Sequence, residues 1–117
     1  MDAADNPNKC DFLNGWQYLQ KRVHETAKKK GWWEKERNDG EMLALMHSEI
    51  SECLEGLRKG NPPDEKIGEF SSAEIELADL VIRLMDMAEG RGWNIAEAII
   101  EKMEYNNKRK YKHGKKF

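Results

Sequence analysis

Four acidic side chains occur as two pairs in the middle of the chain. Glu49 and Glu52 lie three positions apart, and so do Glu76 and Asp79. In an α-helix, residues three apart share a face, so each pair would present its two carboxylates together. Four carboxylates around one space repel one another unless protons or a metal ion compensate them. The pattern predicts a site for a hard divalent cation, Mg²⁺ or Mn²⁺; the alternative is two solvated helix faces.

The two pairs lie on helices that can fold back on each other. A breaker segment with one Gly and two Pro, residues 60–64, separates them. Apolar spacing and capping residues predict these helices over residues 41–59 and 72–89, and two more over residues 11–30 and 95–108. Four helices with short links predict an all-α fold, a four-helix bundle.

The helix predicted over residues 72–89 has one narrow polar stripe. On a helical wheel with about 100° per residue, the four polar residues of this stripe fall within an arc of roughly 80°. The stripe consists of Glu76, Asp79, Arg83 and Asp86. Apolar residues fill nearly all of the remaining surface. A helix of this kind belongs at the centre of a bundle or an oligomer, so we expect the protein to be oligomeric.

A chain of 117 residues predicts one domain. Its expected parts are a flexible N-terminal arm (1–10), a helical domain (11–109) and a basic tail (110–117). Residues 108–117 hold six of the 20 Lys and Arg and no acid, so the rest of the chain has 14 basic against 22 acidic side chains. This asymmetry fits a metal site with an anion-binding arm. It fits nucleic-acid binding less well, because the acidic body would repel the polymer.

Cysteine usage and hydropathy indicate a cytoplasmic, reducing location. Cys10 and Cys53 have no paired spacing, which argues against a disulfide framework or a zinc site. The N-terminal stretch over residues 1–9 is polar, and no apolar run approaches the ~18 residues that a membrane span needs. We therefore expect no membrane association.

A second set of residues could bind an anion or a base. Lys102, Asn106 and Arg109 share one face of the last predicted helix and offer charge and N–H donors suited to phosphate. The alternative is a solvated helix end beside a basic tail. Trp33 could stack on a nucleobase or pack in the core, and His24 is a weaker candidate for a functional role.

Several separated motifs resemble the MazG-like family of all-α nucleotide pyrophosphohydrolases. In order, the matching segments are His24–Ala27, Lys30–Trp33, His47–Glu52, Glu76–Asp79, Lys102–Asn106 and His113–Phe117. The resemblance implies the all-α NTP pyrophosphatase fold, assembled as a dimer or a dimer of dimers. It also implies Mg²⁺-dependent hydrolysis of a nucleoside triphosphate, (d)NTP, to (d)NMP and pyrophosphate. Lys110 departs from the family pattern, in which Pro is expected.

The resemblance further implies a role for each candidate residue. The Mg²⁺ ligands would be Glu49, Glu52, Glu76 and Asp79, and Glu49 or Glu52 would activate the attacking water. The phosphates would be bound by Lys102, Asn106 and Arg109, and the base or sugar by His24 and Trp33. Two alternatives remain open. One is a non-catalytic nucleotide- or (p)ppGpp-binding regulator, and the other is a structural or nucleic-acid-binding helical module.

Overall fold

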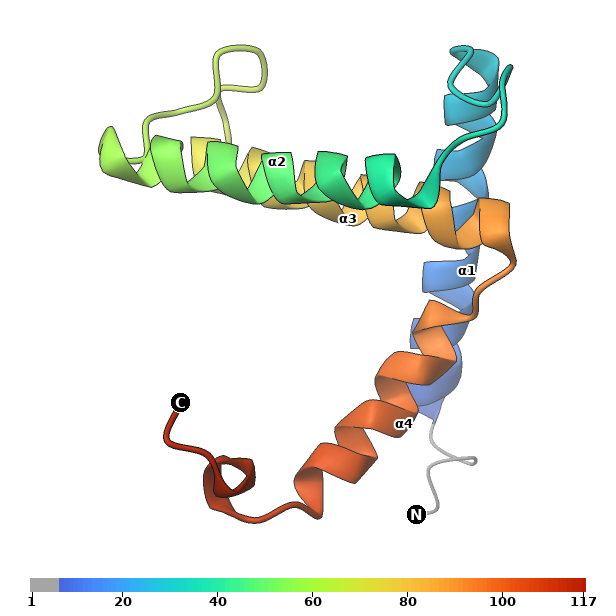
Figure 1. The fold of residues 1–117 in the computed structure, drawn as a ribbon, viewed down its shortest axis with the longest axis vertical. Helices are drawn as coiled ribbons and strands as arrows, with labels where there is room; N and C mark the ends of the chain where they lie inside the picture. Colours follow the sequence, from blue (N-terminus) through green and yellow to red (C-terminus); the bar gives the residue numbers. More distant parts are fainter. Residues whose placement is uncertain (1–6) are drawn as a thin grey trace.

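The computed structural model describes residues 7–117 and contains four α-helices (Figure 1). In order these are α1 (Pro7–Lys29), α2 (Asp39–Arg58), α3 (Ser72–Arg91) and α4 (Ile95–Asn107), followed by the short 3₁₀ helix η2 (Tyr111–Gly114). No β-strand occurs between residues 7 and 117; one isolated bridge joins Pro63 and Ser71. The predicted all-α class is confirmed. No helix in this part of the chain is both long enough and apolar enough to cross a bilayer.

The helix boundaries differ from the predicted ones mainly at the two ends of the chain. α1 begins at Pro7 and not near Asp11, so residues 7–10, predicted as part of a flexible arm, are helical. The rest of that predicted arm, residues 1–6, lies outside the described residues. The predicted basic tail contains η2.

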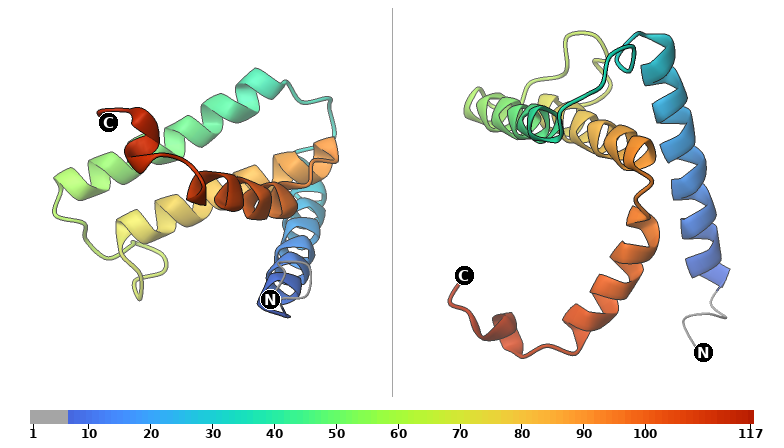
Figure 2. Two further views of the ribbon diagram at one scale, coloured as in Figure 1. Left: turned by 90° about the horizontal axis from the view of Figure 1, so that it is seen from below. Right: turned by 45° about the vertical axis from the view of Figure 1, so that its right-hand side comes forward.

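The helices form an open arrangement in one chain. α2 and α3 lie antiparallel and side by side, and α1 crosses the C-terminal half of α3 (Figures 1 and 2). α4 packs mainly against α1 and extends away from the α2–α3 pair. The radius of gyration is 17.0 Å, against about 13 Å expected for a compact chain of this length. The chain is thus less compact than usual for its length. Its most extensive helix–helix contact is the one between α2 and α3.

Capping residues fix where the paired helices begin. Asn38 Oδ1 accepts a hydrogen bond from the backbone N–H of Glu41 at the start of α2. Ser71 and Glu74 form a reciprocal capping box at the start of α3. Such a cap typically contributes about 1 kcal/mol. By setting the first turn of α3, the capping box also sets which face the later acidic residues occupy.

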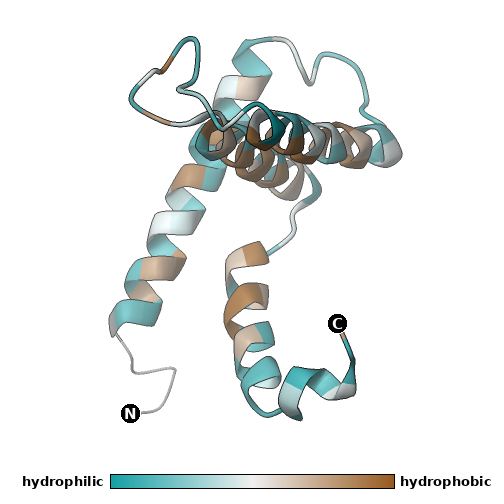
Figure 3. Cartoon of the chain, turned by 90° about the vertical axis from the view of Figure 1, so that its left-hand side faces the viewer, coloured by the Kyte–Doolittle hydropathy of each residue, from teal (hydrophilic) through white to brown (hydrophobic). Residues whose placement is uncertain are grey.

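Few apolar side chains are buried, and many large ones are exposed. The buried ones are Met42, Cys53, Met85, Met87, Ala88 and Ala96. On α2, Leu43, Ile50, Leu54 and Leu57 are each about half exposed, and their spacing places them on one stripe. Apolar positions recur along α2, α3 and α4 in Figure 3. Of the α1 and α4 positions with apolar spacing, Leu19 and Met103 are also exposed.

Gly56 lets α2 and α3 approach closely near their linked ends. A Cβ atom at Gly56 would lie 2.5 Å from Ser72 Oγ and 3.0 Å from Ser72 Cβ. The hydroxyl could rotate away, but the Cβ contact could be relieved only by moving backbone. The close approach at Gly56 thus helps to hold the facing surfaces of the two helices together.

We therefore predict that Gly56→Ala destabilises the protein by about 1–3 kcal/mol, as overpacking typically does. Gly15→Ala is the matched control, because Gly15 also lies inside a helix but a Cβ there would meet nothing within 4 Å. That variant should gain about 0.5–1 kcal/mol from helix propensity. Urea denaturation of both variants measures the difference, and a stabilised Gly56→Ala would contradict the packing argument.

Candidate metal centre

Three carboxylates from α2 and α3 meet at one point between the helices. Glu49, Glu76 and Asp79 each offer an oxygen atom, and these atoms lie within 4.8 Å of one another. Glu49 comes from the middle of α2, and the other two come from one face of α3. The antiparallel pairing of the helices thus brings together acids that are far apart along the chain. These are three of the four acids that the i, i+3 spacing predicted to face one space.

Glu49 is the most constrained of the three. Its side chain is 8% exposed, and its Oε1 accepts a 2.9 Å hydrogen bond from Arg83 Nε. Its Oε2 is buried and has no hydrogen-bond partner in the described part of the chain. A buried carboxylate oxygen without a partner costs free energy unless a ligand compensates it. Arg83 therefore neutralises one oxygen of Glu49 and leaves the other without a partner.

Glu52 is exposed and lies outside the three-carboxylate group. It lines a broad pocket of about 750 Å³ together with Glu49, Glu76 and Asp79. We call this the loop pocket, because residues 62–67 of the α2–α3 loop form its other wall. The structure thus gathers all four predicted ligands, with Glu52 at the rim.

The carboxylates are close enough to raise the pKa of two of them. Desolvation, then hydrogen bonding to Glu49 and Glu52 and repulsion by both, raises the pKa of Glu76 from 4.5 to about 7. Desolvation and repulsion by Glu49 also raise the pKa of Asp79, and the nearby Arg83 lowers it in part. A proton on Glu76 therefore stabilises the cluster up to about neutral pH, and a bound cation would replace it.

The donor set fits a hard divalent cation. It consists of carboxylate oxygens alone, with no His or Cys among the clustered groups. Such ligands favour Mg²⁺ or Mn²⁺ over zinc. With the acids ionised, Glu49 Oε2 has no partner, so a proton on Glu76 or a bound cation would compensate it.

A second, narrower cavity of about 310 Å³ adjoins the cluster. Its walls include Glu49 and Asp79 on one side and Lys30, Trp32 and Arg37 on the other. We call it the Trp32 cavity. The carboxylate cluster therefore lies at the junction of two hollows, one opening toward the α2–α3 loop and one toward the end of α1.

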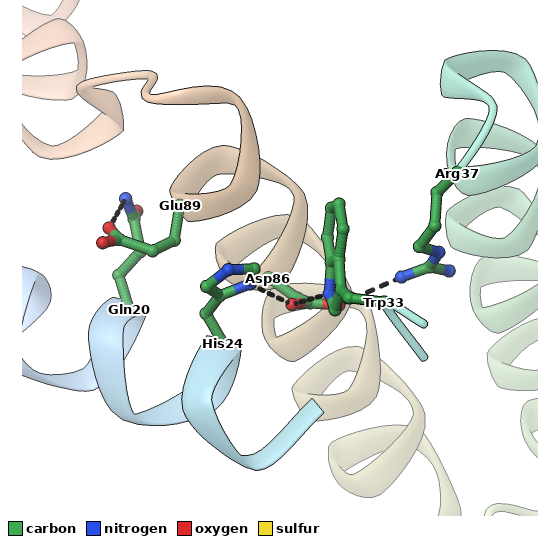
Figure 4. A network of polar contacts seen from close by, with 6 residues as sticks. All are labelled: Gln20, His24, Trp33, Arg37, Asp86 and Glu89. Carbon is green, nitrogen blue, oxygen red and sulfur yellow. Dashed lines mark hydrogen bonds and ion pairs between the residues drawn. The ribbon is translucent and has the colours of Figure 1, made fainter. Parts of the chain in front are cut away.

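His24 and Trp33, predicted to contact a base or sugar, both bind Asp86 in the structure (Figure 4). His24 Nδ1 and Trp33 Nε1 each lie 2.8 Å from Asp86 Oδ1, and Arg37 bonds to Oδ2. The Trp33 ring also packs on Gly90, where a Cβ would lie 2.4 Å from Cη2. Neither His24 nor Trp33 lines the Trp32 cavity. Their observed role is to hold α1 and the α1–α2 loop against α3.

A neighbouring contact extends this network along α1. Gln20 is 2% exposed, and its Nε2 donates a 3.1 Å hydrogen bond to Glu89 Oε1 (Figure 4). Its Oε1 accepts a hydrogen bond from Trp16 Nε1. Sequence analysis did not identify Gln20, because a single polar residue on an amphipathic helix gives no signal. Asp86 did have a signal, since it belongs to the polar stripe of α3.

The predicted phosphate-binding residues lie apart from the carboxylates. Lys102 and Asn106 are on α4, which extends away from the α2–α3 pair, and Arg109 follows that helix (Figure 1). Lys102 Nζ and Arg109 Cζ lie 4.6 and 5.5 Å from the centre of the Tyr105 ring. One chain therefore does not bring these residues to the cluster. The cations that share a hollow with the cluster are Lys30, Arg37 and Arg83 in the Trp32 cavity and Lys59 and Lys66 in the loop pocket.

The raised pKa of Glu76 predicts a pH dependence of stability without metal. Because the folded protein holds this proton more tightly than the unfolded chain, its contribution is present below pH 4.5 and is lost as the pH rises through about 7. Urea unfolding of wild type and Glu76→Gln from pH 5 to 8 should show wild type losing stability relative to the variant. Mg²⁺ should stabilise wild type more at pH 8 than at pH 5.

Glu55→Gln is the control for this experiment, because Glu55 is an exposed carboxylate on α2 paired with Arg58 on the surface. Its pH profile should run parallel to that of wild type. If the Glu76→Gln profile is also parallel to wild type, Glu76 does not titrate as described.

No family model, curated protein or solved structure matches the chain. The resemblance to the MazG-like family therefore rests on the motifs alone. The function must be argued from the carboxylate cluster and the two hollows beside it.

Proposed function

We propose that the protein is a metal-dependent nucleoside triphosphate pyrophosphohydrolase of the MazG-like type. Its reaction would convert a (d)NTP to a (d)NMP and pyrophosphate. The observation that carries the proposal is the buried, unpaired Oε2 of Glu49 beside two further carboxylates, Glu76 and Asp79. Mg²⁺ is typically held by one or two carboxylates plus the phosphates of a substrate. The motif resemblance supports the same reaction class.

The geometry supports a division of roles among the acids. Glu49, Glu76 and Asp79 would hold Mg²⁺ or Mn²⁺, which when bound would neutralise the triphosphate and the charge that develops during transfer. Glu52, exposed at the rim, is the carboxylate left to orient the attacking water and accept its proton. Arg83 keeps Glu49 Oε1 occupied and so leaves Oε2 free to bind a cation. The bond that breaks joins the α and β phosphates.

The exposed apolar stripe of α2 supports a homo-oligomer. Leu43, Ile50, Leu54 and Leu57 form a continuous surface of the kind that protein interfaces cover. A second copy could also bring α4, with Lys102 and Asn106, to the carboxylates that α4 does not reach in its own chain. We propose a dimer or a dimer of dimers in which these residues bind phosphate.

The catalytic proposal predicts that Glu49→Gln and Asp79→Asn each reduce pyrophosphate release by at least about 100-fold, since even outer-shell changes at metal sites cost 10–100-fold. The assay is a panel of NTPs and dNTPs with Mg²⁺ or Mn²⁺, scored for pyrophosphate. Glu41→Gln, at an exposed acid of the same helix that lines neither hollow, should retain activity. Circular dichroism should show unchanged helical content in all three variants.

Undiminished turnover in Glu49→Gln or Asp79→Asn would remove the assignment. Saturable nucleotide binding by wild type, without pyrophosphate release under either metal, would instead favour the non-catalytic regulator. Salt-sensitive binding of nucleic acid that survives loss of Glu52 and disappears on deleting residues 108–117 would favour a nucleic-acid-binding module.

The oligomer proposal predicts that Leu54→Lys lowers the molar mass measured by light scattering, because a charge would be buried at the interface. Tyr18→Lys is the matched control: Tyr18 is similarly exposed, but on α1 and away from the stripe. Wild-type protein that is monomeric at high micromolar concentration, or a Leu54→Lys variant of unchanged mass, would contradict an interface on this stripe.

A further inference from the structure

The Trp32 cavity contains an aromatic surface that the fold covers only in part: Arg37 Cζ lies 5.9 Å from the centre of the Trp32 ring, and the side chain stays largely exposed. Trp32 lines the cavity and is 60% exposed, whereas Trp33 beside it is anchored by Asp86 and Gly90. An exposed indole contributes little to the stability of a single chain. Here it faces a concave space that also contains the carboxylates of the cluster, so a ligand in that space could contact both.

The backbone holds Trp32 in place before any ligand arrives. α1 ends in a Schellman motif, in which Gly31 adopts a φ of +90°. The Trp32 N–H donates to Ala27 O at 3.1 Å, and the Gly31 N–H donates to Lys28 O at 3.1 Å. Because Trp33 is fixed on α3, the backbone is restrained on both sides of Trp32. A platform restrained in this way loses little entropy when a flat group stacks on it.

The charges in the cavity indicate what the flat group would carry. Arg37 is paired with Asp86, and Arg83 is paired with Glu49. Lys30 lines the cavity and has no ion-pair partner among residues 7–117. The cavity thus presents an aromatic face and one uncompensated cation next to a candidate Mg²⁺ site. A planar ring joined to a phosphate, as in the nucleoside monophosphate part of a nucleotide, matches these three features.

We propose that the Trp32 cavity binds the nucleoside end of the substrate, with Trp32 stacking on the base and Lys30 facing the α phosphate. This inference rests on the proposed function and adds an orientation to it. The pyrophosphate end would lie toward the loop pocket, whose walls include Lys59 and Lys66. The base contact would then be made by Trp32, and not by Trp33.

Calorimetric titrations in Mg²⁺ can separate the base contact from the phosphate contacts. The two probes are the α,β-methylene analogue of dATP, which cannot be hydrolysed at that bond, and inorganic tripolyphosphate, which has no base. Trp32→Ala should weaken binding of the analogue by roughly tenfold or more, since stacking on one base is worth ~1–3 kcal/mol. Its affinity for tripolyphosphate should be unchanged. Trp32→Phe should lose less, because it keeps a ring.

Trp93→Ala is the matched control, because Trp93 is another half-exposed indole but does not line the cavity. It should alter neither titration. Unchanged affinity of Trp32→Ala for the analogue, an equal loss for both probes, or no binding of the analogue to wild type would each overturn the inference. If wild type hydrolyses nucleotides and Trp32→Ala binds normally, only the inference fails. If the analogue binds through Trp32 but no nucleotide yields pyrophosphate, the inference stands and the proposed function fails.

Discussion

The structure depends on how charge is compensated along the inward-facing stripe of α3. At one end of the stripe, Asp86 interacts with His24, Trp33 and Arg37, so its carboxylate is fully satisfied. At the other end, Glu76 and Asp79 face Glu49, and carboxylates meet carboxylates. The same stripe therefore has one end whose charge is fully paired and one end where carboxylates cluster. Unpaired buried charge is costly, so the clustered end requires protons or a cation.

While polar groups lie between the helices, large apolar side chains are exposed on the outer surface. Leu77, Val81 and Ile82 on α3, and Leu54 on α2, are exposed in the single chain. In an ordinary amphipathic helix the apolar face is buried and the polar face is solvated. Here part of the arrangement is reversed: carboxylates occupy space between α2 and α3, and several apolar side chains of both helices face outward. The proposed oligomer would supply the apolar burial that one chain lacks.

Sequence patterns were informative where they reflect helical geometry, and less so where they depend on tertiary packing. The four helices and the convergence of Glu49, Glu76 and Asp79 follow from periodicity and i, i+3 spacing. The direction of α4 does not, because a helix with weak apolar contacts to its own chain has no local signal for its position. Which of Trp32 and Trp33 is anchored on α3 likewise cannot be read from the local sequence. It depends on Gly90, which is far along the chain but packs against the Trp33 ring. Asp86 was visible as part of the stripe, but its three partners were not.

The carboxylate cluster also has a consequence for how the protein folds. All four acids lie within residues 49–79, on a single capped helical hairpin, so the chain closes only a short loop to bring them together. Closing a loop of this length costs little chain entropy. Mutual repulsion of the acids opposes that step. A divalent cation held by these acids would thus favour the pairing of α2 with α3 as the chain folds.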